Sequence, residues 1–220
     1  LKRKDKMVIC VTSTESGDGK TFLSTNLAAL YSMTGKKTLL IDLDLRKPNI
    51  HTKLGLENGM GMSNYLIGDC EIEDILMTNT PFGFDLMRAG TVPPNPGELV
   101  HSDKMTNMIN AMREKYDYIV MDTSPIGLVP DAYALINNSD LCLYVIRCMQ
   151  TNKSFCKQTL EQMMEVVDNT EKVQIVLSDI PTEGRHSYGS GYGYGYGGYG
   201  GYGYGHLGYG GYGGYGYGYG

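Results

Sequence analysis

The sequence predicts an α/β domain with a doubly wound, mostly parallel sheet, followed by a disordered C-terminal tail rich in Gly and Tyr. Three observations predict this organisation. Short β-rich runs alternate with helical patterns over the first 180 residues, several of these runs are apolar on successive residues, and the composition changes abruptly near residue 181. Alternating strands and helices favour a parallel sheet, and uninterrupted apolar runs are typical of strands buried on both faces.

The elements follow one another in a regular order. Strands are expected at residues 7–12, 37–42, 84–88, 118–122, 141–147 and 173–178. Helices are expected between them, at residues 20–33, 97–115, 131–137 and 152–167. Gly35 supplies a stop after the first helix, and Pro96-Gly97 supplies a start for the second. The segment 48–81 is less regular, and two short surface helices are expected there.

The end of the chain has a composition of its own. The 33 residues from Tyr188 to Gly220 hold 12 of the 18 Tyr and 18 of the 30 Gly, and they include no Asp, Glu, Lys or Arg. Glycine loses the most backbone entropy on ordering, and this tract has no helical periodicity. We therefore expect a globular domain over residues 1–186 and a disordered tyrosine-rich tail over residues 187–220.

Composition excludes several classes of protein. No run of eighteen apolar residues occurs, so no membrane-spanning helix is predicted. The net charge of -5 argues against a general nucleic-acid binder. The five Cys include no Cys-x-x-Cys pair, which indicates reduced thiols and a cytoplasmic location.

A candidate phosphate loop links the first strand to the first helix. Residues 14–21 read Thr-Glu-Ser-Gly-Asp-Gly-Lys-Thr, with Thr14 where the general pattern has its first Gly. Gly17 and Gly19 let backbone N–H groups face phosphate oxygens, at the positive end of the following helix. The alternative is a glycine-rich turn that happens to contain Gly-Lys-Thr, but strand, loop and helix stand in the required order. The loop therefore predicts a phosphate-loop (P-loop) NTPase fold, and its predicted nucleotide-binding residues are Gly17, Asp18, Gly19, Lys20, Thr21 and Phe22.

Acidic residues end two of the predicted strands. Asp42 and Asp44 end the second strand, and Asp122 ends the fourth. Ligands of open α/β sheets bind beyond the carboxyl ends of the strands, so these three acids are expected to face the metal and the γ-phosphate. Any one of them could instead simply cap a strand or begin a turn.

Taken with the loop, two further motifs give a family resemblance. The segment Asp42-Leu-Asp44-Leu-Arg46-Lys-Pro and the segment ending Asp122-Thr-Ser-Pro resemble bacterial tyrosine kinases of the capsular and extracellular polysaccharide systems. The resemblance implies ATP and Mg²⁺ as cofactors, with Thr21, Asp44 and Asp122 on the metal and Asp42 as the base for the tyrosine hydroxyl. Arg46 pairs either with the γ-phosphate or with an acid in a structural ion pair. The implied catalytic residues are Lys20, Asp42, Asp44, Asp122 and Arg46.

The resemblance also gives the tail a role. It implies a protein-tyrosine kinase that autophosphorylates its C-terminal cluster, between subunits, and regulates exopolysaccharide or capsule synthesis and export. The substrate would be the chain's own tail or that of a neighbouring subunit. The implied acceptors are Tyr188, Tyr192, Tyr194, Tyr196, Tyr199, Tyr202, Tyr204, Tyr209, Tyr212, Tyr215, Tyr217 and Tyr219.

Assembly and location follow from the same resemblance. It implies a ring-type homo-oligomer for the full-length protein and a membrane-anchored activator, either upstream or in a separate chain. It also implies a position at the inner face of the cell membrane, through a segment absent from this sequence. No nucleic-acid partner is expected.

Two other readings of the chain remain open at this stage. Partition and division-site ATPases share the predicted fold, but they place a second Lys where this chain has Glu15. A nucleotide-binding interaction module with an aromatic condensation tail is the other alternative, because low-complexity aromatic tracts associate readily.

Overall fold

The computed structural model describes residues 6–181, which form a single open sheet with helices on both faces. Its strands are β1 (Met7–Ser13), β2 (Thr38–Leu43), β3 (Leu76–Met77), β4 (Asp85–Met87), β5 (Tyr118–Thr123), β6 (Leu141–Arg147) and β7 (Val173–Ser178). Its helices are α1 (Lys20–Met33), α2 (Ile50–Lys53), α3 (Met62–Ile67), α4 (Ile72–Ile75), α5 (Pro96–Val100), α6 (Asp103–Lys115), α7 (Ala132–Asn137) and α8 (Lys153–Val166), with a 3₁₀ turn at Thr170–Lys172. The predictions for the tail and its tyrosines fall outside the described residues.

The strand order places β1 and β5 at the centre of the sheet. The seven strands run β3-β4-β2-β5-β1-β6-β7, and every neighbouring pair is parallel except β3 with β4. Asp42 of β2 lies opposite Asp122 of β5, and Val11 of β1 also pairs with Asp122. The carboxyl ends of β1, β2 and β5 therefore meet at one edge of the sheet, where the phosphate loop leaves β1.

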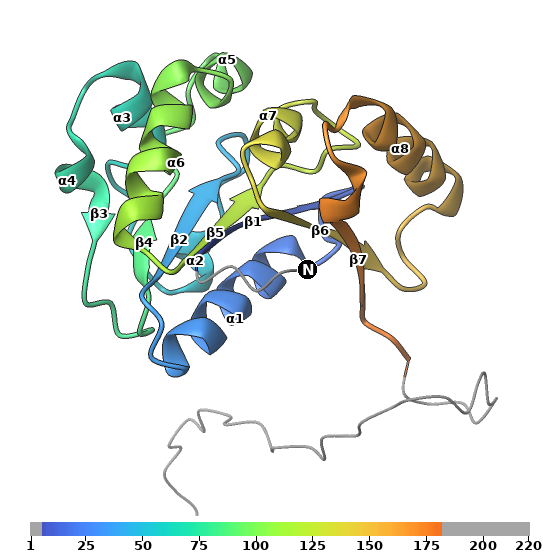
Figure 1. Ribbon diagram of the computed structural model, residues 1–220, viewed down its shortest axis with the longest axis horizontal. Helices are drawn as coiled ribbons and strands as arrows, with labels where there is room; N and C mark the ends of the chain where they lie inside the picture. Colours follow the sequence, from blue (N-terminus) through green and yellow to red (C-terminus); the bar gives the residue numbers. More distant parts are fainter. Residues whose placement is uncertain (1–5, 182–220) are drawn as a thin grey trace, which may run out of the picture. The chain divides into compact units, whose positions relative to one another are not determined.

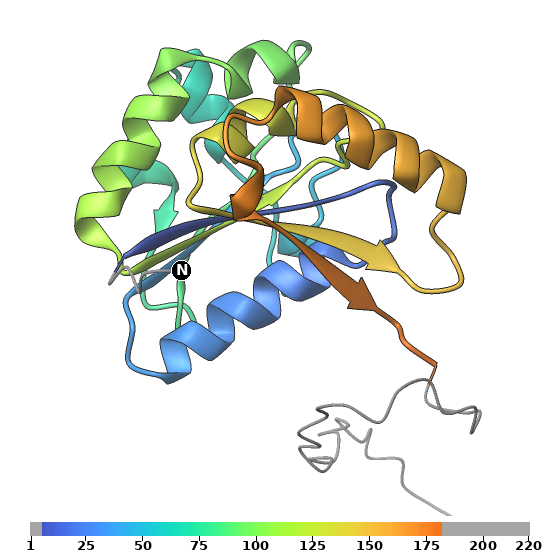
Figure 2. The ribbon, with the colours of Figure 1, turned by 45° about the vertical axis from the view of Figure 1, so that its right-hand side comes forward.

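Helices cover both faces of the sheet (Figure 1). Helix α1 crosses one face, and α6, α7 and α8 lie across the other, as the turned view also shows (Figure 2). Each face has its own apolar cluster. On the face of α1, Ala28 packs with Ile9, Leu40 and Val120, whereas on the opposite face Met108 of α6 packs with residues such as Ile119.

The predicted fold class is confirmed, and so are the main elements. The bounds of α1, β6 and β7 are those expected. Strands β1 and β5 extend one residue further than expected, and β2 is shifted by one residue at both ends. These strands are continuous apolar runs whose residues are buried on both sides. None of the helices within residues 6–181 combines the length and apolar character needed to cross a bilayer.

Two predictions about the elements were wrong. The helix expected over 97–115 is broken into α5 and α6, because the Ser102 hydroxyl accepts a hydrogen bond from the Met105 amide and starts a new helix there. The segment 48–81 holds three short helices instead of two, and it also contains the antiparallel edge strand β3. With two residues, β3 is too short to give a period-2 signal in the sequence.

Candidate functional site

The phosphate loop is built as the sequence predicts, between the end of β1 and the first turn of α1. Gly17 and Gly19 have φ values of 97° and 105°, a region that L side chains rarely adopt. Gly19 is the N-cap of α1, and Leu23 N donates to its carbonyl oxygen at 3.0 Å. The loop therefore places the N-terminus of a 14-residue helix at the ligand side of the sheet.

A polar cavity of about 410 Å³ lies over this loop. Gly17, Gly19, Lys20 and Thr21 line it on the loop side, and Asp44 lines it from the end of β2. The segment after β2 adds side chains that sequence reasoning did not single out, namely Lys47, Asn49 and Lys53. We call this space the phosphate cavity.

Lys20 is a buried cation held among carboxylates. Its residue surface is only 6% exposed. Burial lowers the pKa of Lys20, and the nearby carboxylates of Asp122 and Asp44 oppose that shift. Lys53 acts in the same direction as burial, so a second ammonium lies close to the first. Two cations that face a polar cavity suit a polyanionic ligand.

Asp122 is fully buried beside Lys20 and Thr21. Burial raises its pKa to about 6, while the Thr21 hydroxyl and the Lys20 ammonium act against this shift. Its Oδ1 atom is buried and has no hydrogen-bond partner within the described residues. A buried carboxylate oxygen without a donor is costly unless a ligand or cation satisfies it.

Asp42 and Asp44 occupy different environments, although they stand two residues apart. Asp42 is 1% exposed, and its two oxygens accept hydrogen bonds from the amides of Asp44 and Ile50, each at 3.3 Å. Burial first, and then the neighbouring Asp122, raises the pKa of Asp42 well above its usual value. Asp44 is half-buried and lines the phosphate cavity. Asp42 thus fixes the loop after β2 through its two hydrogen bonds, and Asp44 is the carboxylate of this loop that faces the phosphate cavity.

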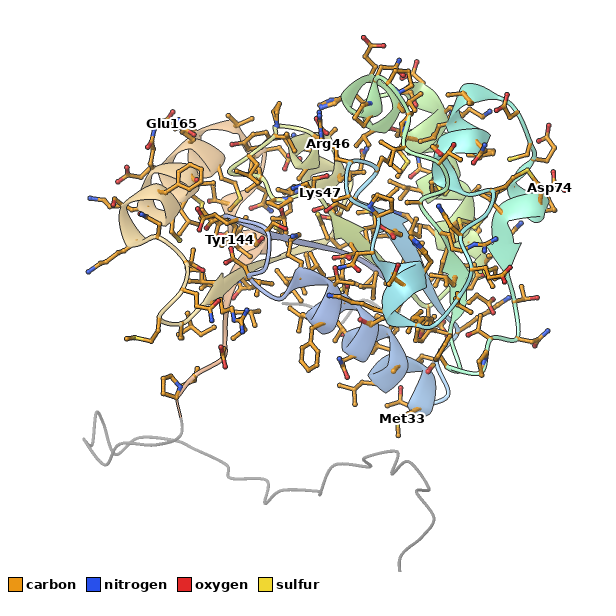
Figure 3. The ribbon with its side chains drawn as sticks, turned by 180° about the vertical axis from the view of Figure 1, so that it is seen from behind. Met33, Arg46, Lys47, Asp74, Tyr144 and Glu165 are labelled. Atoms are coloured by element: carbon orange, nitrogen blue, oxygen red, sulfur yellow. The ribbon has the colours of Figure 1, made fainter. Side chains whose placement is uncertain are left out.

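Arg46 forms an ion pair with Asp131. A structural ion pair with an acid was one of the two roles that the sequence left open for Arg46, the other being a contact with the γ-phosphate. Its Nε donates to Asp131 Oδ2 at 2.7 Å and its Nη2 donates to Asp131 Oδ1 at 3.2 Å. Arg46 does not line the phosphate cavity. Figure 3 shows Arg46 and Lys47 together on the loop after β2, with Met33 at the far end of α1.

Asp18 and Phe22 differ in how they face the site. Asp18 is buried, and its oxygens accept hydrogen bonds from Thr151 Oγ1 at 2.7 Å and from the Glu15 amide at 2.8 Å. Phe22 is 70% exposed and lines a second cavity of about 440 Å³ together with Arg147 and Ser178. Asp18 therefore braces the loop from behind, while Phe22 lies open to a ligand.

The carboxyl ends of β6 and β7 support the phosphate loop. Arg147 Nη1 donates to the Gly17 carbonyl oxygen at 3.2 Å, and Ser178 Oγ donates to the Asp18 carbonyl oxygen at 2.9 Å. Sequence reasoning missed Thr151, Arg147 and Ser178 as loop contacts, because they lie more than 120 residues away and belong to no local motif.

Replacing Thr151 by Val should weaken nucleotide binding without removing it. The change removes the hydrogen bond from Thr151 Oγ1 to the buried carboxylate of Asp18, a contact generally worth about 1.5–3 kcal/mol, and also the bond that this oxygen accepts from the Arg147 amide. If about 1 kcal/mol of this appears in nucleotide affinity, the dissociation constant rises about fivefold. Titration with a fluorescent ATP analogue measures it. Thr170→Val, at an exposed threonine, is the matched control, and equal affinities for both variants would contradict the bracing role.

Comparisons with known proteins agree with this geometry. An AAA domain model matches residues 6–177. The chain is 34% identical over 188 residues to the tyrosine-protein kinase CpsD of Streptococcus agalactiae, covering 84% of this chain and 79% of CpsD. It is 36% identical over 155 residues to the tyrosine-protein kinase YwqD of Bacillus subtilis, covering 70% and 65%. Some relatives are much longer, since the chain spans 24% of EpsB of Ralstonia solanacearum at 32% identity.

Comparison with solved structures also finds tyrosine kinase domains. The kinase domain of the Escherichia coli tyrosine kinase ETK has a TM-score of 0.76 at 28% identity, covering 86% of this chain and 74% of that one. The chimeric protein CapA2B2 has a TM-score of 0.73 at 28% identity, covering 80% and 77%. Cobyrinic acid a,c-diamide synthase of Mycobacterium smegmatis, at 18% identity and a TM-score of 0.64, shares the fold alone. The phosphate loop, the acids at the ends of β2 and β5, and these relatives together show that the chain is a nucleotide-binding domain and belongs to the bacterial tyrosine kinases of the capsular and extracellular polysaccharide systems.

Proposed function

We propose that this domain transfers the γ-phosphoryl group of ATP to tyrosine hydroxyls, and that tyrosines of residues 188–220 are its acceptors. The observation that carries the proposal is the buried Lys20, flanked by Asp44 and Asp122 at the mouth of an intact phosphate loop. The tyrosine-protein kinases CpsD and YwqD support the choice of acceptor. Exopolysaccharide or capsule synthesis and export is the process that the family would regulate here.

The two cavities suggest how ATP is held. The phosphates bind in the phosphate cavity, against the amides of Gly17 and Gly19 and the ammonium of Lys20. The base and ribose bind in the cavity beside Phe22, whose exposed ring offers a stacking surface. Arg147 and Ser178 line the same cavity, and both donate hydrogen bonds to the phosphate loop. The base would therefore contact two residues that also hold the loop in place.

The residues present fit a magnesium ion. Carboxylate and hydroxyl oxygens are the ligands that Mg²⁺ prefers. Thr21 lies beside Asp122, and Oδ1 of Asp122 has no hydrogen-bond partner among residues 6–181. Held there by Thr21 and Asp122, Mg²⁺ would neutralise the negative charge that develops on the phosphates. Lys20 and Lys53 supply further positive charge from the protein.

Tyrosine transfer needs an acceptor for the phenolic proton. The phenol oxygen attacks the γ-phosphorus, ADP leaves, and the proton passes to a carboxylate. Asp44 suits this role better than Asp42, because Asp44 lines the phosphate cavity while both oxygens of Asp42 are occupied by backbone amides. We therefore propose that Asp44 accepts the proton and that Thr21 and Asp122 bind the metal. The sequence-based prediction was different, because it placed Asp44 on the metal and gave the proton to Asp42.

The tract from 188 to 220 has the composition of an efficient acceptor. Gly stands on one or both sides of every Tyr from Tyr192 onward, so the backbone near each phenol meets little steric resistance. No flanking charge distinguishes one tyrosine from another. Fully extended, 33 residues span roughly 110 Å, enough to reach the site of a second copy. We infer a division into a kinase domain over 1–186 and an acceptor tail over 187–220.

Partners and location are further parts of the proposal. The match to the chimeric protein CapA2B2 is consistent with an activator that works with the kinase, and we propose a membrane-anchored one. A ring-type homo-oligomer would bring the tail of one subunit to the site of the next. ATP and the five free thiols suit the cytoplasm, at the inner face of the membrane.

Incubating the full chain with Mg²⁺ and ATP tests the proposal. Mass mapping should find phosphotyrosine within residues 188–220, and replacing the tract's tyrosines by Phe should remove it. ATP hydrolysis with no tyrosine modification would instead support a partition-type ATPase. That alternative is not favoured, because Glu15 occupies the position where those enzymes carry a second Lys.

A further inference from the structure

Thr14 stands where the general phosphate-loop pattern has its first Gly. The backbone at Thr14 does not require Gly, because its φ is not positive. The Thr14 hydroxyl group lies 2.7 Å from the hydroxyl group of Tyr144 in β6, and either group can be the donor. Both residues are fully buried, so water does not compete for this hydrogen bond. Thr14 therefore makes a side-chain contact that Gly could not make.

Tyr144 reaches the loop from a fixed position. It lies between β6 and α8, in the apolar cluster that also contains Cys156 and Met163 of α8 (Figure 3). Tyr144 pairs in register with Thr12 of β1, so its side chain extends past the end of β1 to the residue that begins the loop. Burial raises the pKa of Tyr144, so the phenol stays neutral and keeps its proton for the hydrogen bond. The packed core thus holds this hydroxyl group in place before any nucleotide binds.

The two halves of the phosphate loop are held by different elements. The carboxyl ends of β6 and β7 hold the second half, through hydrogen bonds to the carbonyl oxygens of Gly17 and Asp18. The first half comprises residues 14–16. Among residues 6–181, Tyr144 is the only residue outside β1 and the loop whose side chain forms a hydrogen bond with this first half. Without Tyr144, the first half would be held only by its connection to β1 and by local hydrogen bonds.

The first half of the loop faces the reacting end of the nucleotide site. Ser16 lines the phosphate cavity together with Asp44, the residue proposed to accept the phenolic proton. The same two residues also line a smaller neighbouring cavity of about 150 Å³, so they stand close together. The γ-phosphate would therefore lie next to the part of the loop that Thr14 begins.

We propose that Tyr144 is a positioning residue for phosphoryl transfer and that it acts through its hydrogen bond with Thr14. The bond keeps the first half of the loop in place, so that the N–H groups from Ser16 onward face the γ-phosphate as charge develops there. Tyr144 itself lines neither nucleotide cavity. This rests on the proposed phosphoryl transfer and deepens it, because Tyr144 belongs to no phosphate-loop motif.

The proposal predicts a loss of rate without a matching loss of affinity. The base is proposed to bind beside Phe22, and Gly19 and Lys20 belong to the N-terminus of α1, so their contacts with ATP do not depend on Tyr144. A displaced first half would weaken contacts with the γ-phosphate, chiefly in the transition state. Tyr144→Phe should therefore lower kcat about tenfold and change the KM for ATP by about twofold or less.

Two substitutions and their combination test the proposal in the full chain with Mg²⁺ and ATP. Tyr144→Phe and Thr14→Val each remove one hydroxyl group and keep most of the side-chain shape, and each should lower kcat about tenfold. The double variant should be no slower than either single variant, because all three lack the same bond. Thr14→Ser keeps a hydroxyl group and should stay within about twofold of the parent. ADP and phosphotyrosine are measured in the same reactions.

Tyr116→Phe is the matched control. Tyr116 is also buried, and its hydroxyl group donates to Asp85 Oδ2 at 2.8 Å. It precedes the amino end of β5, whereas the loop lies at the carboxyl ends of the strands. Tyr116→Phe should lower the melting temperature, as Tyr144→Phe does, but it should leave kcat within about twofold of the parent.

The outcomes separate the positioning role from a structural one. A Tyr144→Phe chain with the kcat of the parent would overturn the proposal, even if its melting temperature falls. Losses that multiply to about a hundredfold in the double variant would also overturn it, because the two side chains would then act independently. ADP formation by the parent without phosphotyrosine would instead reject the proposed function, and the rates of ADP formation would still test the pair.

Discussion

Replacing Lys20 by Met lowers tyrosine phosphorylation by about 10²–10³-fold, the loss expected when a preorganised group that stabilises transition-state charge is removed. Lys20 starts α1, is almost fully buried and lies between Asp122 and Asp44. Met has a similar length without the charge, so the shape of the loop is kept. The transferring phosphoryl group would then lose the one cation that the loop directs at it.

The measurement is the initial rate of phosphotyrosine formation with saturating ATP. Lys36→Met, at an exposed lysine in the turn before β2, is the matched control and should keep the rate of the parent. Circular dichroism should show that both variants are folded. A Lys20→Met chain that phosphorylates tyrosine at the rate of the parent would contradict the assignment of this loop.

Asp44→Asn should be far more damaging than Asp42→Asn. Asp44 lines the phosphate cavity, and loss of its proton-accepting oxygen should reduce transfer by about 10²–10⁴-fold. Asp42 only accepts hydrogen bonds from the amides of Asp44 and Ile50, so its amide variant should lose about tenfold or less through a displaced loop.

The order of these two effects decides between the assignments. A larger loss for Asp42→Asn would restore the base role that the family resemblance implies for that residue. Thermal unfolding of both variants is the necessary companion measurement. Asp42→Asn should lower the stability more than Asp44→Asn does, because Asp42 is the more deeply buried and both its oxygens are bonded.

Most of the fold could be predicted because its signals are local. The strands β1, β2 and β5 are uninterrupted apolar runs, and α1 follows a loop with Gly at both positions where φ is positive. The break between α5 and α6 was missed because Ser102 looks like an ordinary helical residue until its hydroxyl is seen to accept from Met105 N. The edge strand β3 depends on its pairing with β4, which no local pattern reveals.

Some residues of the candidate site could likewise be predicted from local sequence patterns, and others could not. Lys20, Asp44 and Asp122 could be predicted because Lys20 and Asp44 follow strands and Asp122 lies at the end of one, and parallel strands bring their carboxyl ends to one edge. Thr151 and Ser178 could not, because their contacts with the loop arise only when β6 pairs with β1 and β7 pairs with β6. The distinction between Asp42 and Asp44 also needed the structure, because it rests on which carboxylate the backbone amides occupy.

Transfer between two distinguishable chains tests the central claim most directly. A full-length Lys20→Met chain labelled with ¹⁵N is mixed with unlabelled active chain, Mg²⁺ and ATP, and phosphotyrosine is mapped on the labelled peptides. The proposed function predicts phosphotyrosine within residues 188–220 of the labelled chain, at a rate that rises with the concentration of active chain. ATP consumption with no phosphotyrosine on either chain would contradict it.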